Sequence, residues 1–484
     1  MKAKRTEIII KPDCKRVFFR PFTPTNEERI AHIIARIMAL PDEMVEYQLT
    51  QVLSEFSERH HKLGDFFLKR FEQVHHYLPA DRQPISQAHR MLIGAYFTQE
   101  YSLESAALFN PSMVWHPDQS DLPAGSRRFI LSLRATGEGH ISSITFRSGV
   151  IDAHNNITVN QPTPFVIAPQ VVPNPSYEKS LFERKLRELG LLPNDFTAHV
   201  MAALSASFTL AELETSVQHA LLRQGRYSGD SRSVAQGILS LAQANYEIAY
   251  TPEQRLSERI IFPFTPAEIN GIEDARFVEF HDDDGRVTYY ATYTAYDGTT
   301  ILPQLLETED FLHFKISTLN GPAVQNKGMA LFPRKLNGLY AMLSRQDNEN
   351  LFLMFSDHVH FWYAKEILLK PAFPWEFVQI GNCGSPIETE AGWLVLSHGV
   401  GPMRKYTIGA FLLDLDDPAR VIGRLKEPLL SPNESEREGY VPNVVYSCGG
   451  LIHGRELIIP YATSDYATTF ATVNLDELLG ELAA

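Results

Sequence analysis

The spacing of apolar residues predicts helices in the first hundred residues of the chain. Thr25-x-x-Glu28 has the form of a capping box. The apolar residues after it recur at helical spacing: Ile30, Ile33, Ile34, Ile37 and Met38. A second helix begins at Pro41-Asp42 and continues towards Phe71, and a third covers about 86–96. These stripes bury one face against the rest of the chain or against another subunit.

The pattern turns to short β-type runs from Asn110 onwards. The runs 128–134 and 141–146 are separated by a turn that carries Gly137 and Gly139. A segment from about 177 to 250 then interrupts them with a helical composition, and after Pro252 the β-type pattern continues almost to the end. We expect the two helical segments to pack together as one subdomain, because each alone is short of a core.

Many short strands separated by turns predict a sandwich, a barrel or a propeller. The β-type stretches, about 110–175 and 255–475, suit a propeller of about five four-stranded blades at roughly 50–60 residues each. The pattern alone leaves the blade number open. The expected domains are an N-terminal helical extension (1–105), the first part of the β fold (106–175), a helical insertion (176–252) and the remainder of the β fold (253–484).

Charge and composition narrow the class of protein. Among 484 residues, 58 are acidic and 44 are Lys or Arg, which gives a formal net charge of −14. This excess argues against binding to nucleic acid or to anionic membranes. No apolar run approaches the roughly 18–20 residues that span a bilayer, and the basic start is followed by too short an apolar run for a signal peptide. The three cysteines, Cys14, Cys383 and Cys448, match no zinc or redox pattern, so we expect a cytoplasmic protein.

The segment 271–277 is the most informative for chemistry. Glu273 and Asp274 stand just before a predicted strand, and Arg276 follows two residues later. Neighbouring strand residues point to opposite faces, so we expect Asp274 and Arg276 to share a pocket that Glu273 does not enter in the same way. An acid beside a cation supports sugar recognition or proton transfer. A surface turn with a local ion pair is the alternative.

Further polar groups stand at the ends of other predicted strands. They are Arg134 with His140, Asn326-Lys327-Gly328, Ser397-His398-Gly399, and the stretch 439–449 that leads to Asp465. Nucleotide-binding loops, dinucleotide fingerprints, nucleophile elbows and complete metal-ligand sets do not occur in the sequence. Acid–base chemistry by carboxylates among aromatic residues is what remains, and this is typical of proteins that act on carbohydrates.

Seven short motifs, in this order, resemble glycoside hydrolase family 130 over about 110–475 outside the helical insertion. They are Phe109 to Ser112, Ser132 to Ala135, Gly271 to Arg276, Thr292 to Gly298, Leu331 to Gly338, Ser397 to Val400 and Gly439 to Val445. The resemblance implies an all-β five-bladed β-propeller, here with an added α-helical N-terminal segment and a helical insertion. It also implies an inverting enzyme that acts on β-mannosides at the propeller axis, without a cofactor.

The resemblance places Asp274 at the position of the general acid and Arg276 at that of its partner, with Ala275 where the family usually has proline. In the family the acid is thought to pass its proton through a sugar hydroxyl, and a raised pKa in a water-poor site would help it. No general base is assigned, although Glu390, Glu436 and Glu438 lie near matched motifs. The implied substrate-binding residues are Asn110, Arg134, Glu273, Arg276, Tyr296, Asp297, Lys327, His398, Tyr440, Asn443 and Asp465.

The identity of the nucleophile, water or phosphate, decides the enzyme class. In a phosphorylase, Arg134, Lys327 and His398 would bind inorganic phosphate as co-substrate, because a dianion needs charge-assisted hydrogen bonds. Phosphorylases of the family usually carry an arginine shortly after the Tyr-Asp-Gly turn, and residues 297–304 contain no cation. We therefore expect hydrolysis of β-linked mannosides, such as β-1,2-mannooligosaccharides. Phosphorolysis that releases mannose 1-phosphate is the alternative, and a mannoside-binding propeller without turnover is a third. The helical segments could also build a homo-oligomer.

Overall fold

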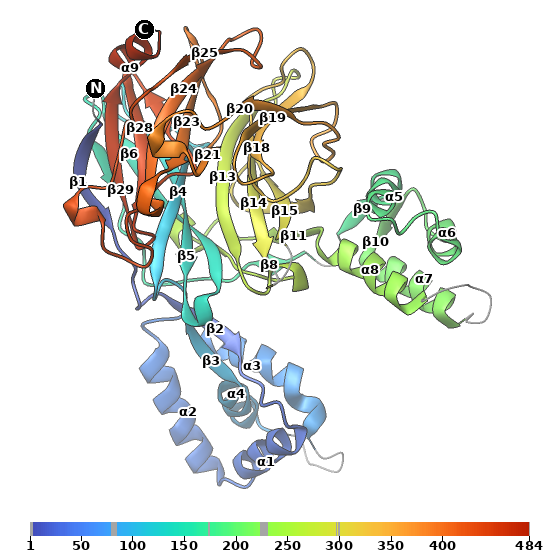
Figure 1. Cartoon of the computed structure of the whole chain (residues 1–484). Coiled ribbons are helices and arrows are strands. Elements are labelled where there is room, and N and C mark those ends of the chain that lie inside the picture. Colours follow the sequence, from blue (N-terminus) through green and yellow to red (C-terminus); the bar gives the residue numbers. More distant parts are fainter. Residues whose placement is uncertain are drawn as a thin grey trace.

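A computed structural model of the chain describes residues 3–78, 85–172, 175–222, 231–296, 298 and 301–483. Its strands form five antiparallel sheets of four to six strands and two short two-stranded ribbons. Figure 1 shows the five sheets gathered in one β-rich body, with one group of helices below it and another at its side. The expectation of a β-rich fold with added helices is confirmed.

The sheets follow one another along the chain, and we number them sheet I to sheet V. Sheet I contains β4 (Ala107–Trp115), β5 (Arg127–Thr136), β6 (Ser142–Ile151), β7 (Ile157–Val159) and β12 (Ile260–Ile261). Sheet II contains β13 (Ile272–His281), β14 (Val287–Tyr296), β15 (Ile301–Thr308), β16 (His313–Thr318), β11 (Tyr246–Ala249) and β8 (Gln170–Val171). Sheet III contains β17 (Lys327–Leu331), β18 (Tyr340–Arg345), β19 (Leu351–Ser356) and β20 (Glu366–Leu369).

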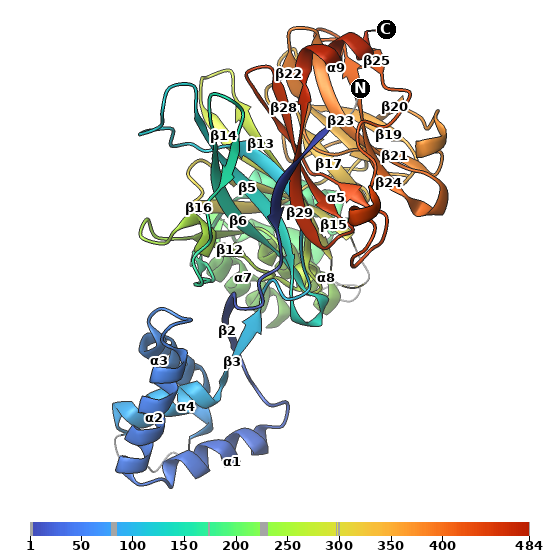
Figure 2. The same ribbon diagram turned by 90° about the vertical axis from the view of Figure 1, so that its left-hand side faces the viewer.

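The last two sheets complete the series, and the final one includes the start of the chain. Sheet IV contains β21 (Gln379–Asn382), β22 (Ile387–Thr389), β23 (Gly392–Val400), β24 (Tyr406–Leu413) and β25 (Val421–Arg424). Sheet V contains β26 (Val445–Tyr446), β27 (Leu451–His453), β28 (Glu456–Thr463), β29 (Ala467–Asn474) and β1 (Lys4–Ile10). Figure 2 shows β1 running along β29.

Consecutive sheets pack face to face through separate hydrophobic clusters. One buried pair illustrates each interface: Val114 with Phe277, Leu305 with Met342, Leu353 with Val395, Leu412 with Ile459, and Leu131 with Phe470. The first four pairs join sheets I to V in chain order, and the last joins sheet V to sheet I. Because both faces of most strands are covered in this way, strands such as β4 and β23 are buried along their whole length.

The helices form two separate groups. The first contains α1 (Glu27–Met38), α2 (Asp42–Phe56), α3 (Leu63–Val74) and α4 (Gln87–Tyr96), and the ribbon of β2 (Val17–Pro21) and β3 (Thr98–Ser102) connects it to the sheets. The second contains α5 (Lys179–Glu188), α6 (Asp195–Ala202), α7 (Leu210–Leu222) and α8 (Ser231–Gln243), with the ribbon of β9 (Ser176–Glu178) and β10 (Ser207–Thr209). A last helix, α9 (Leu475–Leu482), follows β29.

The structure differs from three expectations about the helices. Asn26, and not Thr25, caps α1, since its side chain accepts hydrogen bonds from the amides of Glu28 and Arg29. The helix expected to run from Pro41 towards Phe71 is divided into α2 and α3. The two groups do not pack together. Each has its own hydrophobic cluster, and Figures 1 and 2 show them apart.

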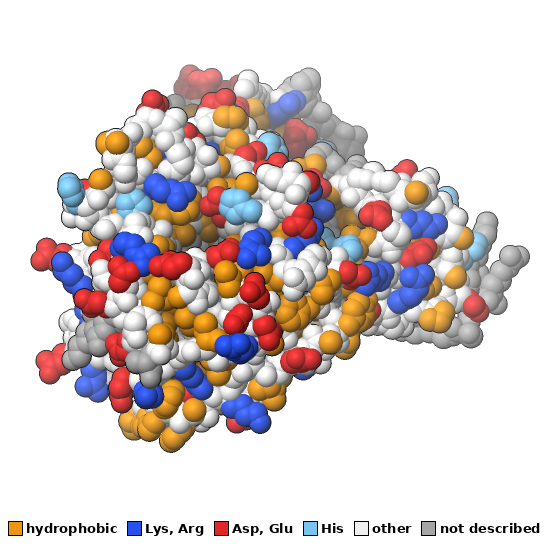
Figure 3. Space-filling model, turned by 90° about the horizontal axis from the view of Figure 1, so that it is seen from above, with side chains coloured by type: hydrophobic (Ala, Val, Ile, Leu, Met, Phe, Trp, Pro, Cys, Tyr) orange, Lys and Arg blue, Asp and Glu red, His pale blue; other side chains and the backbone are white. Residues whose placement is uncertain are grey.

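The described surface carries mixed charges. Figure 3 shows Lys and Arg side chains interspersed with Asp and Glu on the face that carries the C-terminus in Figure 1. Among the described residues, no helix is both long and apolar enough to cross a membrane.

Candidate active site

One strand in each of sheets I, II and III is irregular beside a polar residue of the site. The pairing register shifts beside Asn110 in β4, beside Asp274 in β13 and beside Gly328 in β17. The backbone is left-handed at these three residues, with φ values of 49°, 53° and 88°. A β-bulge redirects the side chains next to it, and bulges are common near active sites. Here three bulges aim polar groups into one shared region.

The carboxylate of Asp274 is at the centre of this region. The Asn110 side-chain amide donates to Asp274 Oδ1 over 2.6 Å, and Arg134 donates to the same oxygen over 3.3 Å. Arg134 also donates to Glu273 Oε1 over 2.8 Å, and Lys327 Nζ lies 3.7 Å from Glu273 Oε2. We expected Glu273 not to enter the pocket of Asp274 in the same way, but both acids contact Arg134. The bulge breaks the alternation of strand residues, so that both acids reach Arg134.

The pKa of Asp274 moves in the direction opposite to the one expected. Burial alone would raise the pKa of this carboxyl. The charges of Arg134, Arg276 and Lys327, with the hydrogen bond from Asn110, outweigh burial and lower the pKa to about 2. Without substrate, Asp274 is therefore ionised at neutral pH.

Arg276 connects backbone segments of the site through hydrogen bonds. Its guanidinium donates to the carbonyl oxygens of Asp274 and Cys383, each over 3.0 Å, and to the hydroxyl of Tyr446 over 2.7 Å. Arg276 thus contacts the main chain of Asp274 and not its carboxylate. Burial opposes its charge, but Tyr446 and the neighbouring thiols outweigh burial and raise the pKa of Arg276. It remains a cation that links sheets II, IV and V.

His398, in β23, lies beside a buried arginine that the motifs did not single out. Nε2 of His398 is 3.3 Å from a guanidinium nitrogen of Arg345 and 3.2 Å from the amide nitrogen of Gln379. Burial and the charges of Arg345 and Arg276 lower the pKa of His398 well below its usual value, so the ring is a neutral acceptor. Arg345 pairs with Lys327 across β17 and β18, so sheet III contributes two adjacent cations.

Asp465 is the second carboxyl group of the site with a shifted pKa. It lies in the turn between β28 and β29, with a φ of 50°. Burial and the charge of Asp274 raise the pKa of Asp465 to about 6, against the opposing effect of Arg134. Two carboxyl groups with such different pKa values are suited to different roles.

The remaining expected residues make contacts that do not involve Asp274. The hydroxyl of Tyr440, which is exposed, lies 3.3 Å from His140 Nδ1. Asn443 accepts a hydrogen bond from Arg437 over 2.9 Å, and the Tyr296 hydroxyl donates to the carbonyl of Gly298 over 2.8 Å. Asp297 lies outside the described residues.

The glutamates considered as a general base have mainly structural contacts. Glu436 is buried and accepts hydrogen bonds from Arg5 and from the hydroxyl of Tyr461. Glu390 lies on the surface and pairs with Arg455. Glu438 is exposed. In the part of the chain that the structure describes, no group of three His, Cys, Asp or Glu side chains could hold a metal ion.

Two residues of the site were missed by sequence reasoning. Arg345 stands alone at the end of the apolar run 339–344, and an isolated cation that ends a buried strand is a signal that could have identified it. Tyr446 belongs to a quoted motif, but only the fold brings it to Arg276. A small cavity beside Arg276 and Lys327 is also lined by Tyr293 and Gly328.

Comparison with known proteins relates this site to one enzyme family. A family described as beta-1,4-mannooligosaccharide phosphorylase matches residues 221–483, more than half of the chain. A 1,2-beta-oligomannan phosphorylase of Thermoanaerobacter sp. (strain X514) is 35% identical over 233 residues, which are 46% of this chain and 75% of that protein. A Beta-1,2-mannobiose phosphorylase of Listeria innocua is 31% identical over 235 residues, which are 46% of this chain and 63% of that protein.

A solved structure is also similar. The Beta-1,2-Mannobiose phosphorylase from Listeria innocua, in complex with beta-1,2-mannobiose, aligns with a TM-score of 0.48 and 23% identity, over 84% of this chain and 96% of that chain. The matched residues 221–483 include Asp274, Arg276, Lys327, His398 and Asp465, whereas Asn110 and Arg134 lie before them. The chain belongs to glycoside hydrolase family 130.

Proposed function

We propose that the protein is an inverting phosphorylase of β-mannosides, with β-1,2-linked mannooligosaccharides as the first substrates to test. The observation that carries this proposal is a buried arginine of sheet III, Arg345, next to the partly exposed Lys327. Arg345 is 6% exposed, and no carboxylate of the described residues lies within 4.0 Å of its guanidinium. A buried charge without a partner is costly. Phosphate bound between Arg345 and Lys327 would supply that partner.

The reaction follows from the arrangement of the charges. Phosphate held by Arg134, Lys327 and Arg345 attacks the anomeric carbon from the face opposite the leaving group. The bond from phosphate oxygen to carbon forms while the glycosidic bond breaks, which converts a β-mannoside into α-mannose 1-phosphate. Asp274 supplies the proton to the leaving oxygen, in the family through a sugar hydroxyl. His398, as a neutral ring, can donate or accept a hydrogen bond without repelling the dianion.

Bound phosphate would also explain how Asp274 can donate a proton although its pKa is low. A carboxyl with a pKa near 2 is a poor proton donor at neutral pH. Two of the cations that lower this pKa, Arg134 and Lys327, are among those that would bind the dianion. Bound phosphate neutralises their field and adds negative charge near Asp274, and both effects raise the pKa of Asp274. We infer that Asp274 becomes protonated when phosphate binds.

The expectation of hydrolysis is not supported, and its alternative is preferred. It rested on the lack of a cation in residues 297–304. Arg345 brings an arginine to the site from another sheet, and the relatives named above are phosphorylases. Water as nucleophile would leave the cations of sheet III without a function.

We further propose that the five sheets are the blades of a closed propeller, with Asp274 near its axis. The hydrophobic clusters that join each sheet to the next, and sheet V to sheet I, support this arrangement. The pairing of β1 with β29 would close the ring. The proposed domains keep the expected boundaries at 105, 175 and 252, except that β1 of the first segment belongs to sheet V and β11 of the third segment belongs to sheet II.

Product analysis tests the function directly. The purified protein is incubated with β-1,2-mannobiose and longer β-mannosides, with and without inorganic phosphate. We expect mannose 1-phosphate only when phosphate is present. Free mannose formed at the same rate without phosphate would identify a hydrolase instead. Saturable binding without any product would identify a binding protein.

A variant tests the role of Arg345. Arg345→Met should raise the KM for phosphate by roughly tenfold to a hundredfold, because a charge-assisted contact is lost. The KM for the mannoside should change much less. Arg334→Met, which removes a surface arginine paired with Glu388 outside the site, serves as the control. An unchanged KM for phosphate in Arg345→Met would contradict the assignment.

A further inference from the structure

A buried carboxylate outside the substrate site holds the loop that leads to Asp274. Glu268 ends a single helical turn (Pro266–Glu268) and is fully buried. Its Oε1 accepts a hydrogen bond from the hydroxyl of Tyr293 over 2.6 Å, and both oxygens lie 3.1 Å from the hydroxyl of Tyr246. Its Oε2 also accepts from the amides of Phe264 and Thr265 over 3.2 Å.

The position of Glu268 fixes the start of β13. The amide of Gly271 donates to the carbonyl of Glu268 over 2.7 Å, and the amide of Asn270 donates to the carbonyl of Tyr296 over 2.9 Å. Gly271 has a φ of 130°, and a side chain there would meet the hydroxyl of Ser142 at 2.5 Å. Three residues further on, Asp274 adopts its left-handed conformation. Such a backbone persists only when its surroundings over-determine it.

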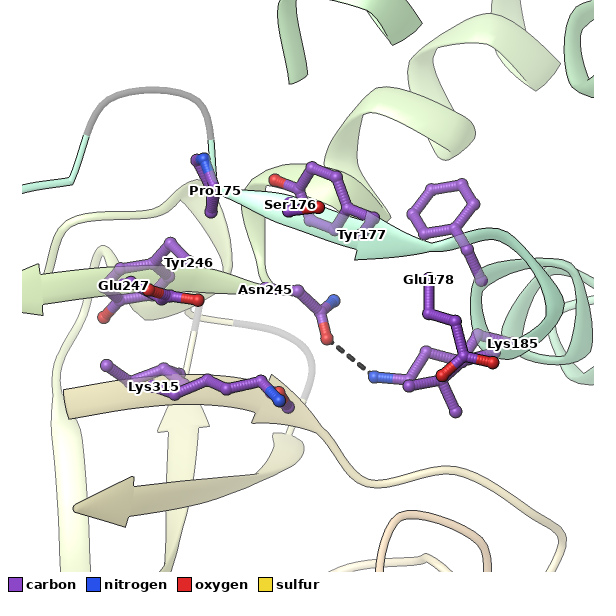
Figure 4. Close-up of a pocket in the computed structure, with 13 residues that line it drawn as sticks. Pro175, Ser176, Tyr177, Glu178, Lys185, Asn245, Tyr246, Glu247 and Lys315 are labelled. Atoms are coloured by element: carbon purple, nitrogen blue, oxygen red, sulfur yellow. Dashed lines mark hydrogen bonds between the residues drawn. The ribbon is translucent and has the colours of Figure 1, made fainter. Parts of the chain in front are cut away.

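The two tyrosines that hold Glu268 face different parts of the molecule. Tyr293 lines the cavity beside Arg276 and Lys327. Tyr246 lines a second cavity of about 150 Å³ between sheet II and the helical insertion, where Figure 4 shows it next to Asn245. One carboxylate thus connects the substrate site to the surface on which the insertion rests.

Asn245 fastens the insertion to that surface. Its side-chain oxygen accepts a hydrogen bond from the ammonium of Lys185, in α5, over 2.6 Å, drawn as a dashed line in Figure 4. Lys185 also donates to the carbonyl and the hydroxyl of Thr318, and the Asn245 amide donates to the carbonyl of Leu241 near the end of α8. Two helices of the insertion therefore meet at the residue that precedes Tyr246.

We propose that Glu268, held by Tyr246 and Tyr293, is a positioning residue for the Asp274 loop, and that Tyr246 makes its position depend on the docked insertion. The catalytic part of this inference rests on the proposed function. Removal of either hydroxyl leaves Glu268 with fewer donors, and the carboxylate can then shift towards the remaining ones. The loop from Glu268 to Asp274 shifts with it, and a small displacement of an acid lowers the rate of proton transfer without abolishing binding.

The chain offers a matched control for this idea. Tyr250 is a buried tyrosine in the same hydrophobic cluster, but its hydroxyl donates to the backbone carbonyl of Ile260 and does not reach Glu268. Tyr246→Phe, Tyr293→Phe and Tyr250→Phe each remove one buried hydroxyl. A purely structural role predicts similar effects of all three.

The kinetic test compares these variants in phosphorolysis of a β-mannoside. Tyr246→Phe and Tyr293→Phe should lower kcat about tenfold while both KM values stay within about twofold. Tyr250→Phe should keep kcat within about twofold of the wild type. Glu268→Gln, which keeps the shape and loses the charge, should resemble the first two variants. Equal kcat values in Tyr246→Phe and Tyr250→Phe would overturn the proposal.

Hydrogen exchange tests the same idea without any substrate. Amide exchange in the segment 264–274 should become faster in Tyr246→Phe, in Glu268→Gln and in Lys185→Met, but not in Tyr250→Phe. Unchanged exchange in Lys185→Met would remove the insertion from the proposal, and unchanged exchange in Glu268→Gln would overturn it entirely. If the wild type forms no mannose 1-phosphate, the proposed function fails, and the exchange data still decide this inference.

Discussion

At the scale of single residues, opposing electrostatic effects set the pKa of Asp274. Arg134, Arg276 and Lys327 favour the ionised carboxylate, while burial opposes it, and the cations prevail. At Asp465 the result is the opposite: burial and the charge of Asp274 outweigh the nearby cations and raise the pKa to about 6. The same side chain therefore behaves differently at two positions because its surroundings differ.

The first prediction concerns the acid itself. Asp274→Asn keeps the size of the side chain but removes the proton that the leaving oxygen needs in the proposed mechanism. We expect kcat to fall by about 10²- to 10⁴-fold, the usual contribution of general acid catalysis. Binding of the mannoside, measured by calorimetry, should survive, because Arg134 keeps its partner Glu273. Unchanged turnover would remove Asp274 from the mechanism.

The second prediction uses the pKa of Asp465. This carboxyl gains its negative charge as the pH rises through about 6, and the new charge opposes an anion bound beside Lys327 and Arg134. Sulfate keeps its charge over this range, so its inhibition constant reports the protein alone. We expect sulfate to bind about threefold to tenfold more weakly at pH 7.5 than at pH 5.

In Asp465→Asn, the position stays neutral at both values of the pH. The inhibition constant of sulfate should then be nearly the same at pH 5 and at pH 7.5. A pH dependence that persists in Asp465→Asn would assign the titration to another group.

At the scale of elements, the sequence predicted the types of structure better than their irregularities. The short β-type runs 128–134 and 141–146 predicted β5 and β6, and the helical spacing of apolar residues after Glu28 predicted α1. The rule of alternation along a strand placed Glu273 and Asp274 on opposite faces, and this was wrong. A bulge depends on how two strands pair, and the pairing of β13 with β14 is not written in β13 alone.

The site residues likewise divide into those that the sequence could identify and those that depend on how the strands pair. Residues on β4, β5, β13 and β17 could be identified, because they stand near the ends of predicted strands or match positions of the family. The segment around Arg345 does not by itself predict a role for this residue, since that role depends on the pairing of β17 with β18. The pKa of Asp274 also required the positions of cations that lie 140 residues before it and 53 residues after it.

The third prediction tests the bulge of β17. Gly328 is left-handed, and a methyl group there would approach the Cβ of Arg345 to 3.3 Å. Gly328→Ala should therefore destabilise the protein by about 1–2 kcal/mol and also raise the KM for phosphate, because Arg345 must move. Denaturant unfolding measures the first effect and steady-state kinetics the second.

Gly338→Ala is the control for this experiment. Gly338 has a similar φ of 80°, but a side chain there meets no atom within 4 Å. Its backbone strain should cost a similar free energy of unfolding and leave the KM for phosphate unchanged. A rise in KM of equal size in both variants would show that strain, and not the position of Arg345, controls phosphate binding.

At the scale of the whole molecule, an acidic protein contains a basic centre. The net charge of −14 would repel phosphate over long distances, so the proposed binding of the dianion would rely on the local cations. Four cations, Arg134, Arg276, Lys327 and Arg345, come from sheets I, II and III. Their arrangement therefore depends on how the sheets are fixed to one another, which in the proposed propeller includes a closure by the pairing of β1 with β29.

The last prediction concerns that closure. Arg5, in β1, donates two hydrogen bonds of 2.8 Å to the carboxylate of Glu436, which is 6% exposed. Arg5→Met leaves this carboxylate with one cation fewer in a buried place, and we expect a loss of about 1–2 kcal/mol of stability at pH 7. Arg334→Met removes an equally well-formed but exposed pair and should cost less than about 1 kcal/mol.

The stabilisation by Arg5 depends on pH, and the pKa of Glu436 determines the direction of this dependence. Burial by itself raises the pKa of Glu436, but the hydrogen bonds from Arg5, Asn433 and Tyr461 outweigh burial and lower it below 4.5. The stabilisation by Arg5 is therefore present above pH 4.5 and is lost as the pH falls below that value. Urea unfolding of the wild type and Arg5→Met should differ at pH 7 and converge towards pH 3. A difference that stays constant with pH would mean that Arg5 stabilises β1 by packing alone.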